Sequence, residues 1–327
     1  MIRETLIKIG KALSSSLPID IIRKLFVGIV RKILMLVKTY TLKKEVNRKI
    51  RNGSKIYIHP IVFFKVILRL FSEPLFPLDN VLKLGEHGFG KKLNQLIKDK
   101  IKRGNPDYFE FKDFKIYVPN FKNAEQVILN DFREIYLENV YTKHFFMGKP
   151  IKRGDIILDL GANIGGFSLW AANQAKDVKV FAVEPHPKIF KELNLNIALN
   201  KLEDSITSIE ICIAEEDGFK KINFDEETFT MTRISTHKDA QEIESMSIDS
   251  LVDKMKLPNL DLIKFDIEGA ERIAILGAKA TLINLKPKLA LSGYHLVDDV
   301  YFLINQILEI QPEYKIIVGS NMHIYAF

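Results

Sequence analysis

The chain is poor in cysteine and tryptophan. Among its 327 residues there is one cysteine, Cys212, and one tryptophan. A single cysteine excludes an internal disulfide framework, so the sequence predicts a protein of the reducing cytoplasm. Cys212 lies in an apolar segment typical of a strand, which favours a small core residue over a nucleophile.

The sequence also lacks an uncharged apolar run of the roughly 18–20 residues that a transmembrane helix needs. Its most apolar stretch, Leu17–Val37, is interrupted by Arg23, Lys24, Arg31 and Lys32. On a helical wheel these charges fall within about half of the circumference. Basic amphipathic helices of this kind lie on anionic membrane surfaces, or pack on the rest of the protein or on a second subunit. For residues 1–72 both alternatives stay open.

Acidic residues are scarce in the first third of the chain. Residues 1–104 contain 23 Lys and Arg against 7 Asp and Glu, whereas the remaining residues contain 25 and 34. The net charge of +7 therefore belongs to the N-terminal part. We predict a basic, largely helical extension over 1–104, a hairpin and helical lead-in over 105–150, and a catalytic domain over 151–327. An acidic catalytic domain has no basic groove, which argues against a nucleic-acid partner.

From Gly154 onward, apolar strand patterns alternate with helical ones. We expect strands near 155–160, 178–183, 206–213, 260–266 and 288–293, and helices near 166–175, 187–200, 248–256, 269–284 and 297–310. This rhythm is typical of a parallel sheet with helices on both faces. The segments 314–318 and 323–327 flank a hairpin-like turn. The fold class is therefore α/β: a doubly wound seven-stranded sheet, Rossmann-like, that ends in an antiparallel hairpin.

A glycine-rich turn follows the first of these strands. Asp159-Leu-Gly161-Ala162-Asn163-Ile-Gly165 leads from a strand into a helix, and Glu184 ends the next strand. This is the pattern of a nucleotide site, where glycines let the backbone approach a ligand and the second acid accepts hydrogen bonds from ribose hydroxyls.

Two details of the turn distinguish between cofactors. Asn163 stands where a dinucleotide fingerprint has its middle glycine, and Asp159 would repel a pyrophosphate. Both suit S-adenosylmethionine, which carries a sulfonium and an ammonium group and no phosphate. Cofactor residues are then Asp159, Gly161, Ala162, Asn163, Gly165 and Glu184, with Ala214, in Cys212–Glu215, beside the adenine.

The chain resembles the FkbM-type S-adenosylmethionine-dependent methyltransferases over about residues 130–327. Besides the glycine turn, the resemblance rests on segments that read Val-Glu-Pro-His-Pro (183–187), followed by Asn196 and Asn200, Ile-Asp-Ser-Leu (248–251), Asp-Leu-Ile-Lys-Phe-Asp-Ile-Glu-Gly-Ala-Glu (261–271) and Leu-Gly-Ala (276–278). The resemblance implies a class I fold and methyl transfer, usually to a hydroxyl oxygen of a sugar, polyketide or other metabolite. In this chain Tyr294 precedes His295, where many relatives have an acidic residue.

Catalysis at a hydroxyl needs a base or a group that stabilises charge. Asp266, Glu268 and His295 are candidates because they follow the ends of strands, and Lys264 is placed to tune a neighbouring acid. Glu271 is expected to be an ordinary acid at a helix N-terminus. We predict no obligatory metal, because only two carboxylates are well placed.

The sequence thus predicts a cytoplasmic S-adenosylmethionine-dependent O-methyltransferase, for which peripheral attachment to the inner face of the membrane through residues 1–72 is one of the two open alternatives. Its acceptor would be a hydroxyl of a saccharide, glycolipid or secondary metabolite. The alternatives are a nicotinamide-dependent oxidoreductase and a catalytically inactive, membrane-associated scaffold. The sequence does not fix the oligomeric state.

Overall fold

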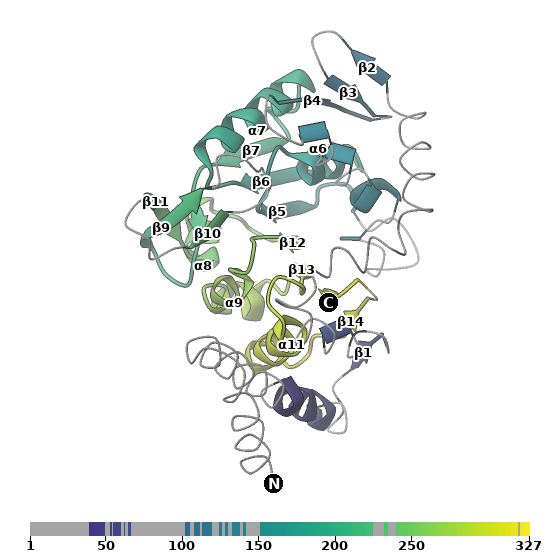
Figure 1. Cartoon of the computed structure of the whole chain (residues 1–327), viewed down its shortest axis with the longest axis vertical. Coiled ribbons are helices and arrows are strands. Elements are labelled where there is room, and N and C mark those ends of the chain that lie inside the picture. The colour runs from purple at the N-terminus through teal and green to yellow at the C-terminus, as the bar shows by residue number, and fades with distance from the viewer. Residues whose placement is uncertain are drawn as a thin grey trace, which may run out of the picture.

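The centre of the protein is a mixed sheet whose strands follow the predicted alternation (Figure 1). The computed structural model describes residues 39–49, 151–224, 240–319 and 321–327, with short segments between 53 and 141 and residues 232–234. The strands of the C-terminal domain's central sheet are β5 (Ile156–Leu160), β6 (Lys179–Val183), β7 (Ile206–Ile209), β12 (Leu262–Phe265), β13 (Lys288–Ser292), β14 (Ile316–Val318) and β15 (His323–Ala326).

The order of these strands confirms the expected fold class. They run β14-β15-β13-β12-β5-β6-β7, with β5, β6, β7, β12 and β13 parallel and β15 antiparallel to both β13 and β14. The order reverses at β5, since the chain moves outward to β6 and β7 and then crosses back to β12. Ligands of open α/β sheets bind at such a switch point, outside the carboxyl ends of the strands.

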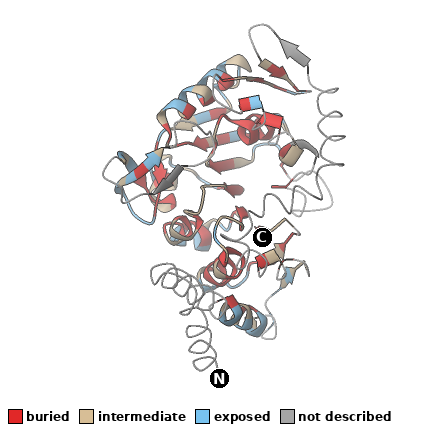
Figure 2. Ribbon diagram, in the orientation of Figure 1, coloured by how far each residue is buried: buried red, intermediate tan, exposed pale blue. Residues whose placement is uncertain are grey.

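Helices cover both faces of this sheet. They are α6 (Gly166–Ala172), α7 (Pro187–Leu199), α8 (Ile248–Lys254), α9 (Glu271–Leu276), α10 (Lys279–Asn284) and α11 (Asp299–Ile310). Neighbouring residues of β5 pack in different apolar clusters: Ile157 lies with residues of α6 and α7, and Leu158 with residues of α8 to α11. The strands are apolar on both faces for this reason, and Figure 2 shows much of the central sheet as buried.

The single helix predicted over 269–284 is two helices, α9 and α10. Gly277 separates them, and a Cβ there would lie 2.4 Å from the carbonyl oxygen of Ala214. The carboxylate of Asp249 accepts hydrogen bonds from the backbone N–H groups of Ala280 and Thr281, at 2.9 and 2.7 Å. A second helix therefore begins where these N–H groups find a partner.

The single strand predicted over 206–213 is divided into β7 and β8 (Cys212–Ile213), which belong to different sheets. The sequence did not predict the other strands of the second sheet, in which β9 (Gly218–Phe224), β10 (Thr232–Ile234) and β11 (Gln241–Met246) join β8 in a four-stranded sheet before α8. β1 (Ile56–Ile58) adds an eighth strand to the central sheet, parallel to β14. Residues 1–104 are thus not simply a helical extension, because part of them completes the sheet.

The helix over 39–49 packs on α11. Val46 is buried in the same apolar cluster as Ile304, and the ammonium group of Lys49 donates to the carbonyl of Asn305 at 3.0 Å. For this segment, packing on the rest of the protein is confirmed. Leu17–Val37 lies outside the described residues. No helix in the described part of the chain is long and apolar enough to cross a membrane.

The predicted hairpin is present as β3 (Tyr108–Glu110) and β4 (Lys115–Tyr117), which pair antiparallel, with β2 (Lys102–Gly104) beside β3. Two side chains of α7 hold its outer edge. Asn196 accepts from the backbone N–H of Tyr117 at 2.8 Å, and Asn200 accepts from and donates to the backbone of Lys115, at 2.7 Å each. Of the helical lead-in predicted before residue 150, the described part is a few helical residues and a π-helix, η1 (Arg133–Leu137).

Candidate active site

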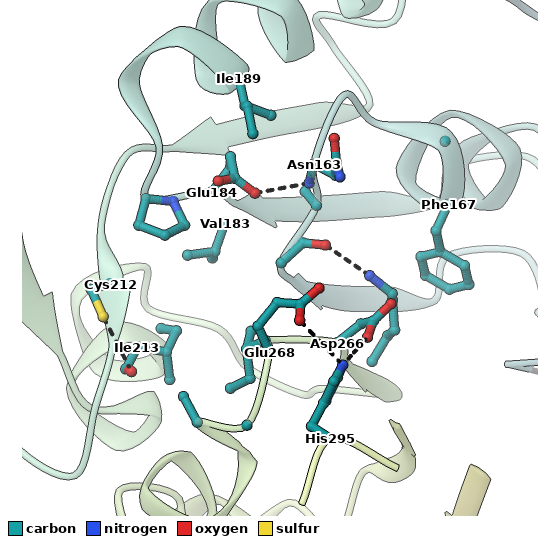
Figure 3. A pocket seen from close by; sticks show the side chains of 18 of the residues that line it. Asn163, Phe167, Val183, Glu184, Ile189, Cys212, Ile213, Asp266, Glu268 and His295 are labelled. Atoms are coloured by element: carbon teal, nitrogen blue, oxygen red, sulfur yellow. Dashed lines mark hydrogen bonds and ion pairs between the residues drawn. The ribbon is translucent and has the colours of Figure 1, made fainter. Parts of the chain in front are cut away.

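A cavity of about 630 Å³ opens at the carboxyl ends of β5, β6, β12 and β13, where the topology predicts a ligand. Figure 3 shows its lining, with Glu184 and Asn163 on one side and Asp266 and His295 on the other. The predicted site residues that line it are Gly161, Ala162, Asn163, Glu184, Lys264, Asp266, Glu268 and His295.

The glycine turn forms the floor between these two sides. Gly161 has φ +74°, and a Cβ at this position would lie 2.0 Å from the carbonyl oxygen of Asp266. Only a glycine lets β5 and the end of β12 approach so closely. The backbone N–H groups of Gly161 and Ala162 both donate to the carbonyl of Val183, which fixes the turn against the end of β6.

Glu184 is buried and points into the cavity. Its two carboxylate oxygens each accept one backbone N–H, from Asn163 at 3.0 Å and from His186 at 2.9 Å. Burial raises the pKa of Glu184 to about 7, although the two backbone hydrogen bonds act in the opposite direction. Each carboxylate oxygen keeps lone-pair capacity for a further donor, such as a hydroxyl group.

Asp159 was predicted to be a cofactor residue, but it is not part of the cavity lining. It is fully buried beneath the turn, where it accepts hydrogen bonds from Lys264 at 2.9 Å and Ser168 at 2.6 Å. The same ammonium group donates to the carbonyl oxygen of Gly161 at 2.9 Å. The Asp159–Lys264 pair therefore supports the turn from below. Ala214 is also buried away from the cavity, whose wall is made there by Cys212 and Ile213.

On the far side, His295 lies among three carboxylates. Its Nδ1 is 2.9 Å from Oε1 of Glu271, while Nε2 is 3.5 Å from Asp266 and 3.7 Å from Glu268. Glu271 is fully buried and also accepts from the backbone N–H of Ile267. Glu271 begins α9, as expected of an acid at a helix N-terminus. It is not an ordinary one, because it also pairs with His295, which comes from a loop that local sequence does not place nearby.

These contacts set the protonation states of His295 and Asp266. Burial alone would lower the pKa of His295, but the hydrogen bond with Glu271 and the charges of Glu271, Asp266 and Glu268 raise it to about 9. Burial would raise the pKa of Asp266, yet Lys264, His295 and the hydroxyl of Tyr141 hold it below its usual value. At neutral pH the cluster therefore contains an imidazolium between carboxylates. The predicted tuning of a neighbouring acid by Lys264 acts on Asp266 through space.

Three polar residues that line the cavity near Asp266 were not predicted from the sequence. Tyr141 donates its hydroxyl to Oδ2 of Asp266 at 2.8 Å, and Glu134 and Tyr294 line the same end. Tyr294 stands out in the sequence only as a departure from the resembled family. Glu134 and Tyr141 precede the recognised motifs and carry no local signal. Glu268 itself has φ +54°, an uncommon conformation that is enriched at functional sites.

In the described segments, no group of three or more His, Cys, Asp and Glu residues is arranged so that it could hold a metal ion. The lining does fit S-adenosylmethionine. A buried carboxylate with spare acceptor capacity faces the cavity at Glu184, the glycine turn brings main chain to its floor, and Ile189, Ile211 and Ile213 give that end an apolar wall for a base.

The fold and this site define the class of the S-adenosylmethionine-dependent methyltransferases. Comparison with known proteins agrees, since residues 159–316 match the methyltransferase FkbM domain. Residues 159–316 therefore carry a methyltransferase domain of the FkbM type.

Individual relatives are distant. Over 93 residues the chain is 31% identical to the 31-O-demethyl-FK506 methyltransferase FkbM of Streptomyces tacrolimicus, a match that covers 28% of this chain and 34% of that one. It is 28% identical over 127 residues to the hexuronic acid methyltransferase AglP of Haloferax volcanii, which covers 38% of this chain and 49% of AglP. The chain thus spans a third to a half of the length of these curated relatives.

Among solved structures, a methyltransferase FkbM from Methylobacillus flagellatus is similar at 23% identity and a TM-score of 0.45, covering 63% of this chain and 54% of that one. The fold class is shown by the strand order of the central sheet.

Proposed function

We propose that the chain is an O-methyltransferase that transfers the methyl group of S-adenosylmethionine to a hydroxyl of a saccharide, glycolipid or secondary metabolite. One observation carries the proposal: an oriented histidine, with Nδ1 on Glu271 and Nε2 toward the cavity, lies across that cavity from Glu184. A hydroxyl acceptor must lose its proton, and a histidine that a carboxylate orients is suited to take it.

We assign the cofactor end of the cavity from the hydrogen-bonding groups that its residues offer. Glu184 accepts hydrogen bonds from the ribose hydroxyls, while the main chain of Gly161, Ala162 and Asn163 approaches the rest of the cofactor. Gly165 closes the turn at the start of α6 with φ +97°, and its Cβ would lie 2.8 Å from Leu193. Asp159 acts through Lys264, which holds the carbonyl of Gly161 in place.

When bound, S-adenosylmethionine supplies an electrophilic methyl group. The chain's own residues align the acceptor and receive its proton. His295 takes that proton on Nε2, Glu271 fixes its ring through Nδ1, and the carboxylates of Asp266 and Glu268 stabilise the imidazolium that results. Tyr141 keeps Asp266 in position through its hydroxyl.

The rate of methyl transfer is expected to rise with pH between 7 and 9. The proposed base must be neutral to accept a proton, and with a pKa of about 9 only about 1% of His295 is neutral at pH 7. The kcat/KM for the acceptor should therefore increase nearly tenfold per pH unit and level off above pH 9. Initial rates over this range, with an NMR titration of the His295 ring, provide the measurement.

A half-buried histidine outside the cavity serves as the control. His59 follows β1 at the edge of the central sheet and is not part of the lining, so His59→Asn should keep the pH profile of the unchanged protein. A profile that is flat from pH 7 to 9 would rule out His295 as the base and leave Asp266 as the proton acceptor.

The acceptor itself is found by mass spectrometry. A knockout strain and its complemented counterpart are compared for a glycan or metabolite that differs by one methyl group. A complementing chain with His295→Asn should bind S-adenosylmethionine but fail to restore that difference. Binding without any methyl transfer by the unchanged chain would instead support the inactive scaffold. The family match favours methyl transfer over nicotinamide chemistry.

We also propose a cytoplasmic location with peripheral attachment to the anionic inner face of the membrane through the part of residues 1–72 that precedes the helix over 39–49. The excess of Lys and Arg in residues 1–104 supports it. Removal of residues 1–38, which spares the helix over 39–49, is expected to lower binding to phosphatidylserine vesicles at least about tenfold in a sedimentation assay. Equal binding of the shortened and the full chain would contradict the attachment.

A further inference from the structure

The cavity end opposite Glu184 is where the acceptor must bind if the proposed function holds. Figure 3 shows Asp266, Glu268 and His295 together on that side. Tyr141, Tyr294 and Glu134 complete it, and they come from different parts of the chain. The chemistry of this end therefore sets the acceptor class.

Carboxylates dominate the acceptor end. Glu134, Asp266 and Glu268 all line it, and all three lie close enough to affect Tyr294. The pKa of that phenol is well above its usual value, first because of burial and then because of the charges of Asp266, Glu134 and Glu268. Glu134 also pairs at 3.4 Å with Arg133, whose side chain is not part of the lining.

The cations that line the described cavity are already engaged. The ammonium group of Lys264 contacts Asp159 and the carbonyl of Gly161, and it faces the ring of Tyr141 at 5.3 Å. His295 is enclosed by Glu271, Asp266 and Glu268. An acid group on the acceptor would thus meet three carboxylates, while both cations of the described lining already contact carboxylates of this chain.

Aromatic rings lie beside these carboxylates. Tyr141 and Tyr294 both pack edge-on against His323, with centroids 5.4 and 5.3 Å away. Phenol rings beside carboxylates offer flat apolar faces together with strong hydrogen-bond acceptors. A ring with C–H groups on its faces and hydroxyl donors on its rim matches both features.

We propose that the acceptor is a neutral polyhydroxylated ring, such as a hexose or cyclitol unit, and that Glu134 and Glu268 exclude acceptors bearing a carboxylate or phosphate near the methylated hydroxyl. This rests on the proposed function. Two carboxylates forced together repel each other strongly enough to favour the neutral member of a pair of otherwise identical sugars at least about tenfold.

The test compares matched acceptors. The full chain is incubated with methyl-deuterated S-adenosylmethionine and methyl glycosides of gluco-, galacto- and manno-configured hexoses, each paired with its uronic acid. Mass spectrometry reports methyl transfer, and saturation-transfer NMR reports binding. Neutral hexosides are expected to bind and to be preferred at least about tenfold in kcat/KM. Glu134→Gln should narrow this preference, whereas Glu125→Gln, an exposed position in the same lead-in, should leave it unchanged.

Two results overturn the proposal. One is that uronic acids bind or react as well as their neutral partners, and the other is that no neutral hexoside binds. Calorimetry with S-adenosylmethionine separates these failures from that of the proposed function. If the cofactor binds and a low-molecular-weight cell extract is methylated on acidic compounds, the acceptor class is wrong and the methyltransferase stands. If the cofactor does not bind, the proposed function itself fails.

Discussion

Replacing Glu184 by Gln lowers the affinity for S-adenosylmethionine by at least about a hundredfold, which isothermal titration calorimetry measures directly. The carboxylate is the buried acceptor at the cofactor end, and its oxygens already hold the backbone N–H groups of Asn163 and His186. A glutamine keeps one acceptor oxygen and turns an N–H₂ group toward a backbone donor. It therefore loses ribose contacts and disturbs the turn at once. Hydrogen bonds to charged groups are worth about 1.5–3 kcal/mol each, so losing one or two accounts for this factor.

The matched control is Glu192→Gln on α7, which changes the same chemistry outside the cavity. It should bind the cofactor as the unchanged chain does. His295→Asn should also bind, because that residue lies across the cavity. Unchanged affinity in Glu184→Gln, with the thermal transition preserved, would remove the ribose assignment.

The second large effect concerns stability. Lys264→Met should lower the free energy of unfolding by about 3–5 kcal/mol, because it leaves the carboxylate of Asp159 buried without its partner. Ser168 alone cannot neutralise that charge. The loss would appear in urea denaturation as a lower midpoint with a similar slope.

A second variant separates charge from packing. Asp159→Asn combined with Lys264→Met removes both charges and should recover much of the lost stability. Lys179→Met, an exposed change on β6, should stay within about 0.5 kcal/mol of the unchanged chain. If Lys264→Met also stays within about 1 kcal/mol, the pair does not hold the turn.

The parallel strands were predictable because each is a short apolar run that ends on a glycine or an acid. β5 and β6 needed no knowledge of distant contacts, since burial on both faces makes them uniformly apolar. β1 could not be recognised in this way. It has three residues, and its partner β14 lies at the other end of the chain. The strands β9 and β11 are partly exposed and polar, which hides them among loop residues.

The site residues also fall into those that lie close together in the sequence and those that are brought together only by the fold. The glycine turn and Glu184 are close in sequence, so their relation could be read locally. Tyr141 reaches Asp266 across 125 positions, and Glu271 meets His295 across 24. Such pairs depend on how loops converge above the sheet, and neither residue type signals it alone.

The pairing of β1 with β14 also constrains how the protein is made. Ile56 and Ile316 are about 260 residues apart, yet they are partners in one sheet. During synthesis the early strand must wait until nearly the whole domain has left the ribosome. Contacts of such high sequence separation form late and slowly. An unpaired strand edge is prone to associate with other chains in the interval, so chaperone supply during translation should affect the yield of this protein.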